Sequence, residues 1–198
     1  MLNRFTMTVV LGALVIGLAA CGELAPPPKP AEEPAADAPK AAAPASEGPY
    51  YEVTKDELTS HPDFTGRNIK VMGVKIGDST TDMEKALGKP TRPATVLDKE
   101  YLAFYRDNSL SMYTFKMTAK VERMELLKSF ADRVADPKIK ALLSSGDLKQ
   151  MRDLFGMEET MIDKPDEMGV EYVYDARGIR LIKYKDGNVG LRFANPKK

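Results

Sequence analysis

The sequence contains a single cysteine, Cys21, and a single histidine, His61, in 198 residues. One cysteine cannot form an intrachain disulfide, so the folded part of the chain must rest on its hydrophobic core. One histidine and one thiol cannot supply a typical zinc site, and a catalytic triad would have to be built on His61. The polar stretch around His61 favours a loop residue over a catalytic base.

Neither sign of charge is in excess, because 29 Lys and Arg residues face 29 Asp and Glu residues. This balance argues against the strongly basic surface typical of nucleic-acid binding. The sequence also has no phosphate-binding glycine loop and no dinucleotide fingerprint. We therefore expect no nucleic-acid partner, no cofactor, no metal and no catalytic residues, and we expect that the protein is not an enzyme.

Residues 1–20 have the order of a bacterial export signal. Arg4 precedes a continuous run of apolar residues and glycine from Val9 to Ala20, which is shorter than the ~20 residues that a membrane-spanning helix needs. Leu18-Ala19-Ala20-Cys21 ends this run and resembles the lipobox of bacterial lipoproteins, in which the cysteine is lipidated and the signal removed. The resemblance implies a lipid anchor on Cys21. A free thiol in an ordinary secretory signal is the alternative.

Gly22 follows the cysteine, where lipoproteins kept at the inner membrane usually have aspartate. This resemblance favours the outer membrane, with the protein facing the periplasm. Residues 21–49 then hold eight of the 14 prolines among Ala, Glu and Lys. Such a composition cannot bury enough apolar surface to fold, so we expect a disordered tether between the lipid and residues 50–198.

Residues 50–198 have the composition of one globular domain, within which one unit is predicted to occur twice. Met83, Leu87 and Gly88 recur at a constant offset as Met151, Phe155 and Gly156. Ser79 and Asp147 are placed as N-caps of the two corresponding helices, and a glycine ends each helix. The first repeat spans about 68–126 and the second about 127–198.

Three strand-like runs follow each predicted helix. They are 101–105, 110–115 and 120–126 in the first repeat, and 170–174, 179–184 and 189–193 in the second. The short connections allow only antiparallel neighbours. We expect residues 126–143 to be helical, with Pro137 marking a break or a second helix, 56–60 to form a short helix, and 68–76 to add a strand to the sheet.

The pattern therefore predicts an α+β fold, in which two tandem helix-plus-three-strand units form an antiparallel sheet of six or seven strands with helices packed on one face. Val74 to Ser79, Met83 to Pro90 and Lys120-Val121 resemble the SmpA/OmlA type of outer-membrane-assembly lipoprotein domain. The tandem form is similar to the β-lactamase inhibitor protein. This resemblance implies binding to other proteins in the cell envelope.

Seven aromatic residues on the predicted strands form the candidate binding surface, because tyrosine contributes a large contact area at small entropic cost. Strand alternation sends some of these rings to the core and some to the open face. The seven are Tyr101, Phe104, Tyr105, Tyr113, Tyr172, Tyr174 and Tyr184.

The sequence leaves three functional hypotheses. The first is a lipid-anchored, non-enzymatic module that binds an envelope protein. The second is a membrane-tethered inhibitor of an extracytoplasmic hydrolase. The third is an enzyme or ligand carrier that uses the space between helices and sheet, which would need a deep pocket with converging carboxylates.

Overall fold

The computed structural model describes residues 49–61, 63–164 and 169–197. The predicted signal peptide, Cys21 and nearly all of the predicted tether lie outside these residues. The described residues have an α+β fold with one eight-stranded antiparallel sheet, one three-stranded sheet and three α-helices. The predicted fold class is confirmed at this level, whereas the predicted number of strands was too small.

The main sheet has the strand order β4-β5-β6-β7-β11-β10-β9-β8, and every neighbouring pair is antiparallel. Its strands are β4 (Arg92–Val96), β5 (Glu100–Tyr105), β6 (Leu110–Phe115), β7 (Lys120–Leu127), β8 (Thr160–Lys164), β9 (Gly169–Tyr174), β10 (Ile179–Tyr184) and β11 (Val189–Ala194).

The remaining elements lie before or between these strands. The α-helices are α1 (Thr80–Leu87), α2 (Pro137–Ser145) and α3 (Leu148–Phe155), and the 3-10 helices are η1 (Leu58–Ser60), η2 (Gly66–Asn68), η3 (Lys128–Arg133) and η4 (Asp175–Arg177). The small sheet contains β1 (Tyr51–Glu52), β2 (Ile69–Val71) and β3 (Val74–Lys75). The prediction that 68–76 extends the main sheet was wrong, since these residues form a hairpin of the small sheet, in which β2 also pairs with β1.

The main sheet consists of two consecutive sets of four strands, each preceded by a helix. Helix α1 begins at Thr80 and its counterpart α3 at Leu148, while β4 begins at Arg92 and its counterpart β8 at Thr160, so the offset in sequence is the same for helix and first strand. For the three later strands of each set, the offset in sequence is one residue larger than for the helix and the first strand. The two sets meet where β7 pairs with β11.

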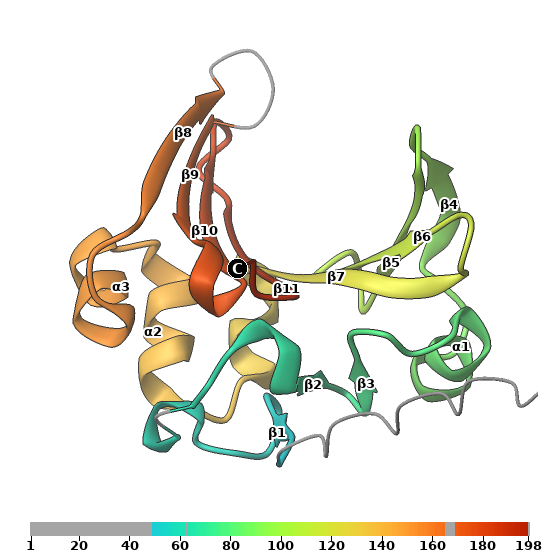
Figure 1. Cartoon of the computed structure of the whole chain (residues 1–198), viewed down its shortest axis with the longest axis horizontal. Helices are drawn as coiled ribbons and strands as arrows, with labels where there is room; N and C mark the ends of the chain where they lie inside the picture. Colours follow the sequence, from blue (N-terminus) through green and yellow to red (C-terminus); the bar gives the residue numbers. More distant parts are fainter. Residues whose placement is uncertain (1–48, 62, 165–168, 198) are drawn as a thin grey trace, which may run out of the picture. The chain divides into compact units, whose positions relative to one another are not determined.

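Residues aligned across the strands share one face of the sheet, and alternate rows are apolar. One buried row passes through Leu110, Leu126, Leu191 and Leu181. These residues belong to the hydrophobic core, together with Met151 of α3. Figure 1 shows the helices and the small sheet on this side of the main sheet, while the outer strands of both sets bend toward the other side. The face without helices is therefore concave.

The helix ends follow the sequence signals. The backbone N–H of Asp82 donates to Ser79 Oγ at 3.1 Å, and that of Lys149 donates to Asp147 Oδ1 at 2.8 Å, so both predicted N-caps are confirmed. Gly88 ends α1 with φ of 80°, a backbone angle that favours glycine. Pro137 starts α2 rather than breaking a helix, because it is the first helical residue, where its missing N–H removes no helical bond.

Strands β4 and β8 were not predicted, although each lies between a predicted helix and the first of the three strand-like runs that follow it. All five residues of β4 are exposed, and β8 is also mostly exposed. Both are the edge strands of the main sheet. An edge strand with little buried surface lacks the apolar alternation by which strands are recognised, so nothing in the local pattern separates it from a loop.

Asp136 links two distant parts of the chain, and its removal tests this link. Its carboxylate accepts hydrogen bonds from the backbone N–H groups of Lys138 and Ile139 and from the N–H and hydroxyl of Thr59. Burial acts to raise the pKa of Asp136, but these hydrogen bonds outweigh burial and hold it below the usual 3.8. We predict that Asp136→Ala lowers the free energy of unfolding by about 1–2 kcal/mol at neutral pH.

Because the pKa is lowered in the folded state, the stabilisation by ionised Asp136 is present at neutral pH and is lost as the pH falls below about 3.8. Urea unfolding of the wild type and of Asp136→Ala should be measured across this pH range. The difference between their free energies of unfolding should become smaller in acid. Asp132→Ala is the matched control, since the side chain of Asp132 is 93% exposed. If Asp136→Ala and Asp132→Ala lowered the free energy of unfolding equally, the capping role of Asp136 would be contradicted.

Candidate binding surface

The concave face of the main sheet carries polar and apolar residues in rows that cross all eight strands. No helix or strand of the described residues covers this face (Figure 1). One row runs from edge to edge through Arg92, Phe104, Ser111, Glu125, Arg192, Arg180, Val173 and Thr160. Its centre is the junction of the two sets of strands, where Glu125 of β7 lies opposite Arg192 of β11.

Glu125 and Arg192 form an ion pair that is almost completely buried. Arg192 Nε donates to Glu125 Oε2 at 2.9 Å, and Arg192 Nη2 lies 2.9 Å from the same oxygen. The side chains of Arg192 and Glu125 are only 5% and 1% exposed. The hydroxyl of Tyr184 donates to the other carboxylate oxygen, and that of Tyr113 lies 3.5 Å from Oε2. The carboxylate is thus held from both sets of strands.

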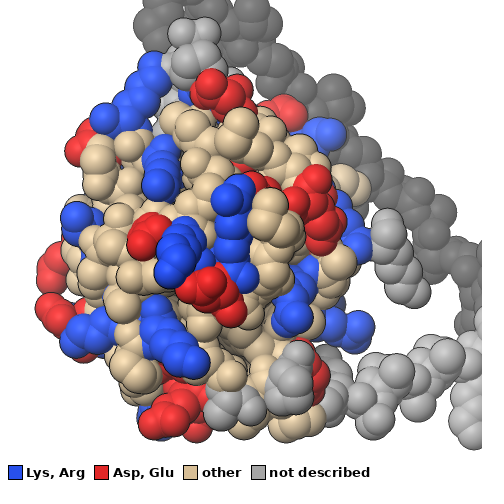
Figure 2. All heavy atoms as spheres, turned by 90° about the vertical axis from the view of Figure 1, so that its left-hand side faces the viewer, with Lys and Arg blue, Asp and Glu red and all other residues tan. Residues whose placement is uncertain are grey.

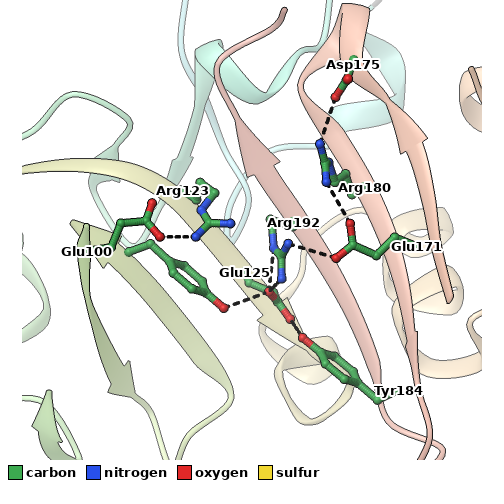
Figure 3. Close-up of polar contacts among 9 residues, drawn as sticks. Glu100, Arg123, Glu125, Glu171, Asp175, Arg180, Tyr184 and Arg192 are labelled. Atoms are coloured by element: carbon green, nitrogen blue, oxygen red, sulfur yellow. Dashed lines mark hydrogen bonds and ion pairs between the residues drawn. The ribbon is translucent and has the colours of Figure 1, made fainter. Parts of the chain in front are cut away.

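The pair continues into a chain of alternating charges across β9 and β10. Arg192 Nη1 lies 3.4 Å from Glu171, which also accepts from Arg180 Nη1 at 2.8 Å. Arg180 Nη2 then donates to Asp175 at 3.2 Å, and Lys197 lies 3.3 Å from the same carboxylate. Figure 3 shows Arg192 between Glu125 and Glu171, with Arg180 linking Glu171 to Asp175. At the centre of this chain of charges, the two arginines, Arg192 and Arg180, therefore balance the two glutamates, Glu125 and Glu171.

The pKa shifts in this cluster all favour the protonation states that maintain it. Burial would lower the pKa of Arg192, but the electrostatic interactions with Glu125, Tyr113 and Glu171 outweigh burial and raise it above the usual 12.5. Burial raises the pKa of Tyr184 above its usual 10, and the neighbouring carboxylate of Glu125 raises it further. Arg192 therefore stays ionised, and the hydroxyl of Tyr184 stays a donor, at all physiological pH values.

Because Gly190 has no side chain, it leaves room for the carboxylate of Glu125. It lies on the concave face of β11, where a Cβ atom would come within 2.5 Å of Glu125 Oε1 and 3.1 Å of the Tyr184 ring. Any larger residue would therefore displace a carboxylate that is held by several hydrogen bonds. A glycine inside a strand that otherwise alternates is the sequence signal for such a close approach.

A second ion pair lies beside the first, on the strands of the first set. Arg123 donates through Nη2 to Glu100, and its guanidinium stacks on the ring of Tyr113, 4.3 Å from the centroid. The guanidinium of Arg192 lies 5.6 Å from the same ring centroid. Tyr113 thus contacts both arginines, and the Nε of Arg123 is buried with no hydrogen-bond partner among the described residues.

The seven predicted aromatic residues do not form one platform. Phe104, Tyr113 and Tyr184 lie on the concave face, where Phe104 lies under Arg92 and both tyrosines contact Glu125. The other four lie on the helix side. Of these, Tyr105 and Tyr174 are buried in the core, Tyr172 packs against it, and Tyr101 is 43% exposed.

The hydroxyl of Tyr174 has no hydrogen-bond partner among the described residues, and burial raises its pKa to about 12, with Glu158 adding to the shift. The ring packs against Phe155 with a centroid distance of 6.0 Å.

His61 stacks on Tyr51 at 3.7 Å between ring centroids, at the end of η1. Among the described residues, no group of histidine, cysteine and carboxylate side chains is arranged to hold a metal ion.

No protein-family model and no curated protein matches the sequence. A solved structure does match. It is the crystal structure of a DUF4309 family protein, YjgB, from Bacillus subtilis subsp. subtilis str. 168, with 18% sequence identity and a TM-score of 0.46 over 72% of this chain and 96% of that one.

This match corrects the family resemblance predicted from the sequence. The resemblance to SmpA/OmlA lipoproteins was wrong, since the structural similarity found is to a DUF4309 protein. The residues that carried the resemblance are helix caps, turns and core positions, which recur wherever a short helix leads into antiparallel strands.

The described part of the chain contains no helix with the length and apolarity needed to cross a membrane.

The buried ion pair gives a quantitative prediction. Replacing Arg192 with methionine leaves Glu125 buried without its cation, and we predict a loss of about 3–5 kcal/mol in the free energy of unfolding. Glu125→Leu should cost a comparable amount, because it leaves Arg192 with only the longer contact to Glu171. The double variant should lose less than the sum of the two, with a coupling of roughly 1–3 kcal/mol.

Chemical denaturation of the four proteins completes this double-mutant cycle. Lys140→Met is the control, because Lys140 forms an exposed pair with Asp132 whose loss should cost at most about 1 kcal/mol. If Arg192→Met were as stable as the wild type, the ion pair would have no structural role.

Proposed function

We propose that this chain is a lipid-anchored, non-enzymatic module that binds an envelope protein with the concave face of its main sheet. The observation that carries the proposal is the asymmetry of the sheet. One face is covered by helices, whereas the other is a curved surface built on a rigid cluster of paired charges. Such a surface is ordered before a partner arrives, so little conformational entropy is lost on binding.

The charge distribution supports a protein partner over a nucleic acid. On the side that includes α3 and β8, Figure 2 shows acidic and basic residues interspersed, without a large patch of either sign. The chain as a whole carries 29 residues of each charge. A surface of mixed charge beside half-buried apolar residues, here Leu102 and Ile162, is typical of the contact regions between proteins.

Anchoring rests on the segment Leu18 to Cys21. We propose that residues 1–20 are removed, that Cys21 is lipidated, and that Gly22 directs the protein to the outer membrane, facing the periplasm. Residues 21–49 then act as a tether, which at ~3.1 Å per residue can hold the binding domain tens of ångströms from the bilayer.

We also propose that the two sets of strands arose from one duplicated unit. The offset between the sets is equal for the helix and the first strand, and it is constant again, one position longer, for the three later strands. This regularity supports a common origin. The repeated unit is a helix with four strands, because α1 is followed by β4 and α3 by β8 ahead of the three predicted strands.

The lipid anchor is tested by Cys21→Ser in the full chain. Wild-type protein should partition with membranes and show the mass of a lipidated Cys21 in intact-mass measurement, whereas the variant should retain its signal peptide or be released as soluble protein. If the variant were processed as the wild type is and still partitioned with membranes, the proposed lipid anchor on Cys21 would be wrong.

The binding face is tested by photo-crosslinking from neighbouring residues that point to opposite faces. Leu102 lies opposite Tyr113 on the concave face, while Tyr101 points to the helix side; Ile162 and Met161 form the same kind of pair on β8. Photoreactive residues at 102 and 162 should give the same adduct with an envelope protein.

Residues 101 and 161 are the matched controls, and they are the more exposed members of each pair. Adducts from these two positions, without adducts from 102 and 162, would place the interface on the other face. Mass spectrometry of the adduct identifies the partner, and a hydrolase that loses activity when bound would identify the protein as an inhibitor.

A further inference from the structure

The two edges of the main sheet differ, although they are equivalent strands of the two sets. Figure 1 shows β4 at one end of the sheet and β8 at the other. In β4, Pro93 has no backbone N–H, and the register with β5 shifts between Arg92 and Thr95. Proline and register irregularities are devices that prevent an edge strand from pairing with another chain. The β4 edge is therefore blocked.

The β8 edge has neither of these devices. All five of its residues pair with β9 in an unbroken register, from Thr160 opposite Val173 to Lys164 opposite Gly169. The strand contains no proline. At the offset that relates β4 to β8, the counterpart of Pro93 is Met161, which keeps its backbone N–H.

The outward-facing backbone of β8 has no partner among the described residues. A strand that pairs on one side only leaves alternate N–H and C=O groups on its other side. Within the described part of the chain, the backbone of residues 160–163 forms no hydrogen bond beyond those of the ladder with β9. Thr160, Met161 and Asp163 are exposed, and Ile162 is half-buried. The groups needed to pair with a further strand are therefore accessible.

We propose that the β8 edge binds an extended segment of another protein, which adds an antiparallel strand to the main sheet. In this mode of recognition, main-chain hydrogen bonds give affinity and alternate side chains give specificity. The antiparallel direction continues the pattern of the whole sheet and is slightly more stable per residue than the parallel one. The inference goes beyond the proposed function, because it uses the backbone of an edge strand and not the concave face.

The side chains of β8 specify the segment. Met161 and Asp163 lie on the helix side of the strand, and Met161 is 59% exposed beside the opposite residue, Tyr172. An apolar side chain opposite Met161 extends this apolar surface. Asp163 has no ion pair among the described residues, so a basic side chain opposite it gives a favourable cross-strand pair. A β-branched residue suits the position opposite Ile162.

A second copy of this chain does not have these features. A symmetric antiparallel pair of β8 strands places one residue opposite its own copy. With the twofold axis at Ile162, Met161 lies opposite the carboxylate of Asp163. With the axis at Met161, Asp163 lies opposite Glu159, and with the axis at Asp163 the two aspartates face each other. Like charges directly opposite are destabilising, so the edge favours a different protein.

Fluorescence anisotropy of labelled peptides with the full chain in detergent tests the proposal. The probe is Thr-Thr-Lys-Val-Val-Thr with both ends blocked, which has a basic, a β-branched and an apolar residue in antiparallel order. The same peptide with N-methyl groups on the lysine and both valines keeps every side chain but cannot donate from these residues. It should bind at least about tenfold more weakly. No binding of the first peptide, or equal binding of both, would overturn the proposal.

Hydrogen exchange locates the bound peptide. Alternate backbone amides in residues 160–163 should exchange more slowly when the peptide is present, because they gain acceptors. The amides of residues 94–96 in β4 are the matched control and should not change. Slower exchange in β4 alone would contradict the assignment of the edge.

Two substitutions in β8 test the edge from the side of the protein. Met161→Pro reproduces the blocked edge of β4 and should abolish peptide binding. Asp163→Lys changes only an exposed side chain and should weaken binding by roughly threefold to tenfold. A peptide with glutamate in place of its lysine should bind this variant more tightly than it binds the wild type.

Asp153→Lys is the control, because it makes the same charge change on the exposed side of α3. Equal weakening by Asp153→Lys and Asp163→Lys would show only a general charge effect and would contradict the proposal. Sedimentation of the full chain in detergent should show a monomer. A dimer that Met161→Pro abolishes would show that a second copy occupies the edge, which would also overturn the proposal.

The edge and the concave face are tested separately. Peptide binding reports on β8, whereas adducts from residue 102 report on β5 in the other set of strands. Adducts from residue 102 without peptide binding would retain the concave face and overturn the edge. Peptide binding without adducts from residues 102 and 162 would retain the edge and overturn the concave face.

Discussion

The ion pair between Glu125 and Arg192 is the interaction on which the rest of the structure depends. It joins β7 to β11, the two strands through which the first set of strands meets the second. Both side chains are buried although no described helix covers their face of the sheet. Removing two charges from water costs several kcal/mol per ion, so the pair persists only because two tyrosine hydroxyls and Glu171 complete its hydrogen bonds. Arg180 in turn donates to Glu171.

This pair also fixes how the two sets of strands align. Arg192 lies between Leu191 and Phe193, which are both fully buried in the core on the opposite face. A slip of one residue between β7 and β11 would turn Arg192 into the apolar core and expose Phe193. The correct register therefore satisfies charge and apolar surface together. It also places Arg123, Arg180 and Arg192 around one hollow of the concave face, which is the proposed binding surface.

Local signals in the sequence predicted most elements, and long-range contacts explain what they missed. The caps Ser79 and Asp147 and the six longer strand runs could be predicted, because each depends on residues a few positions apart. Strands β4 and β8 could not, since only pairing with β5 and β9 makes them strands. The ion pair was also missed: Glu125 and Arg192 are far apart in sequence, and a charge in an alternating strand is expected to face solvent. For the same reason, strand alternation alone could not assign the tyrosines to the core, the ion-pair cluster or the surface.

The most direct test is isotope-edited NMR of the arginine Nε–H groups in the folded protein. If Arg192 is buried and donates to Glu125 as described, its Nε–H signal should exchange with water far more slowly than that of the exposed Arg67. Substituting Glu125 with leucine should remove this protection. An Arg192 signal that exchanges as fast as that of Arg67 in the wild-type protein would contradict the buried pair and the organisation of the concave face that depends on it.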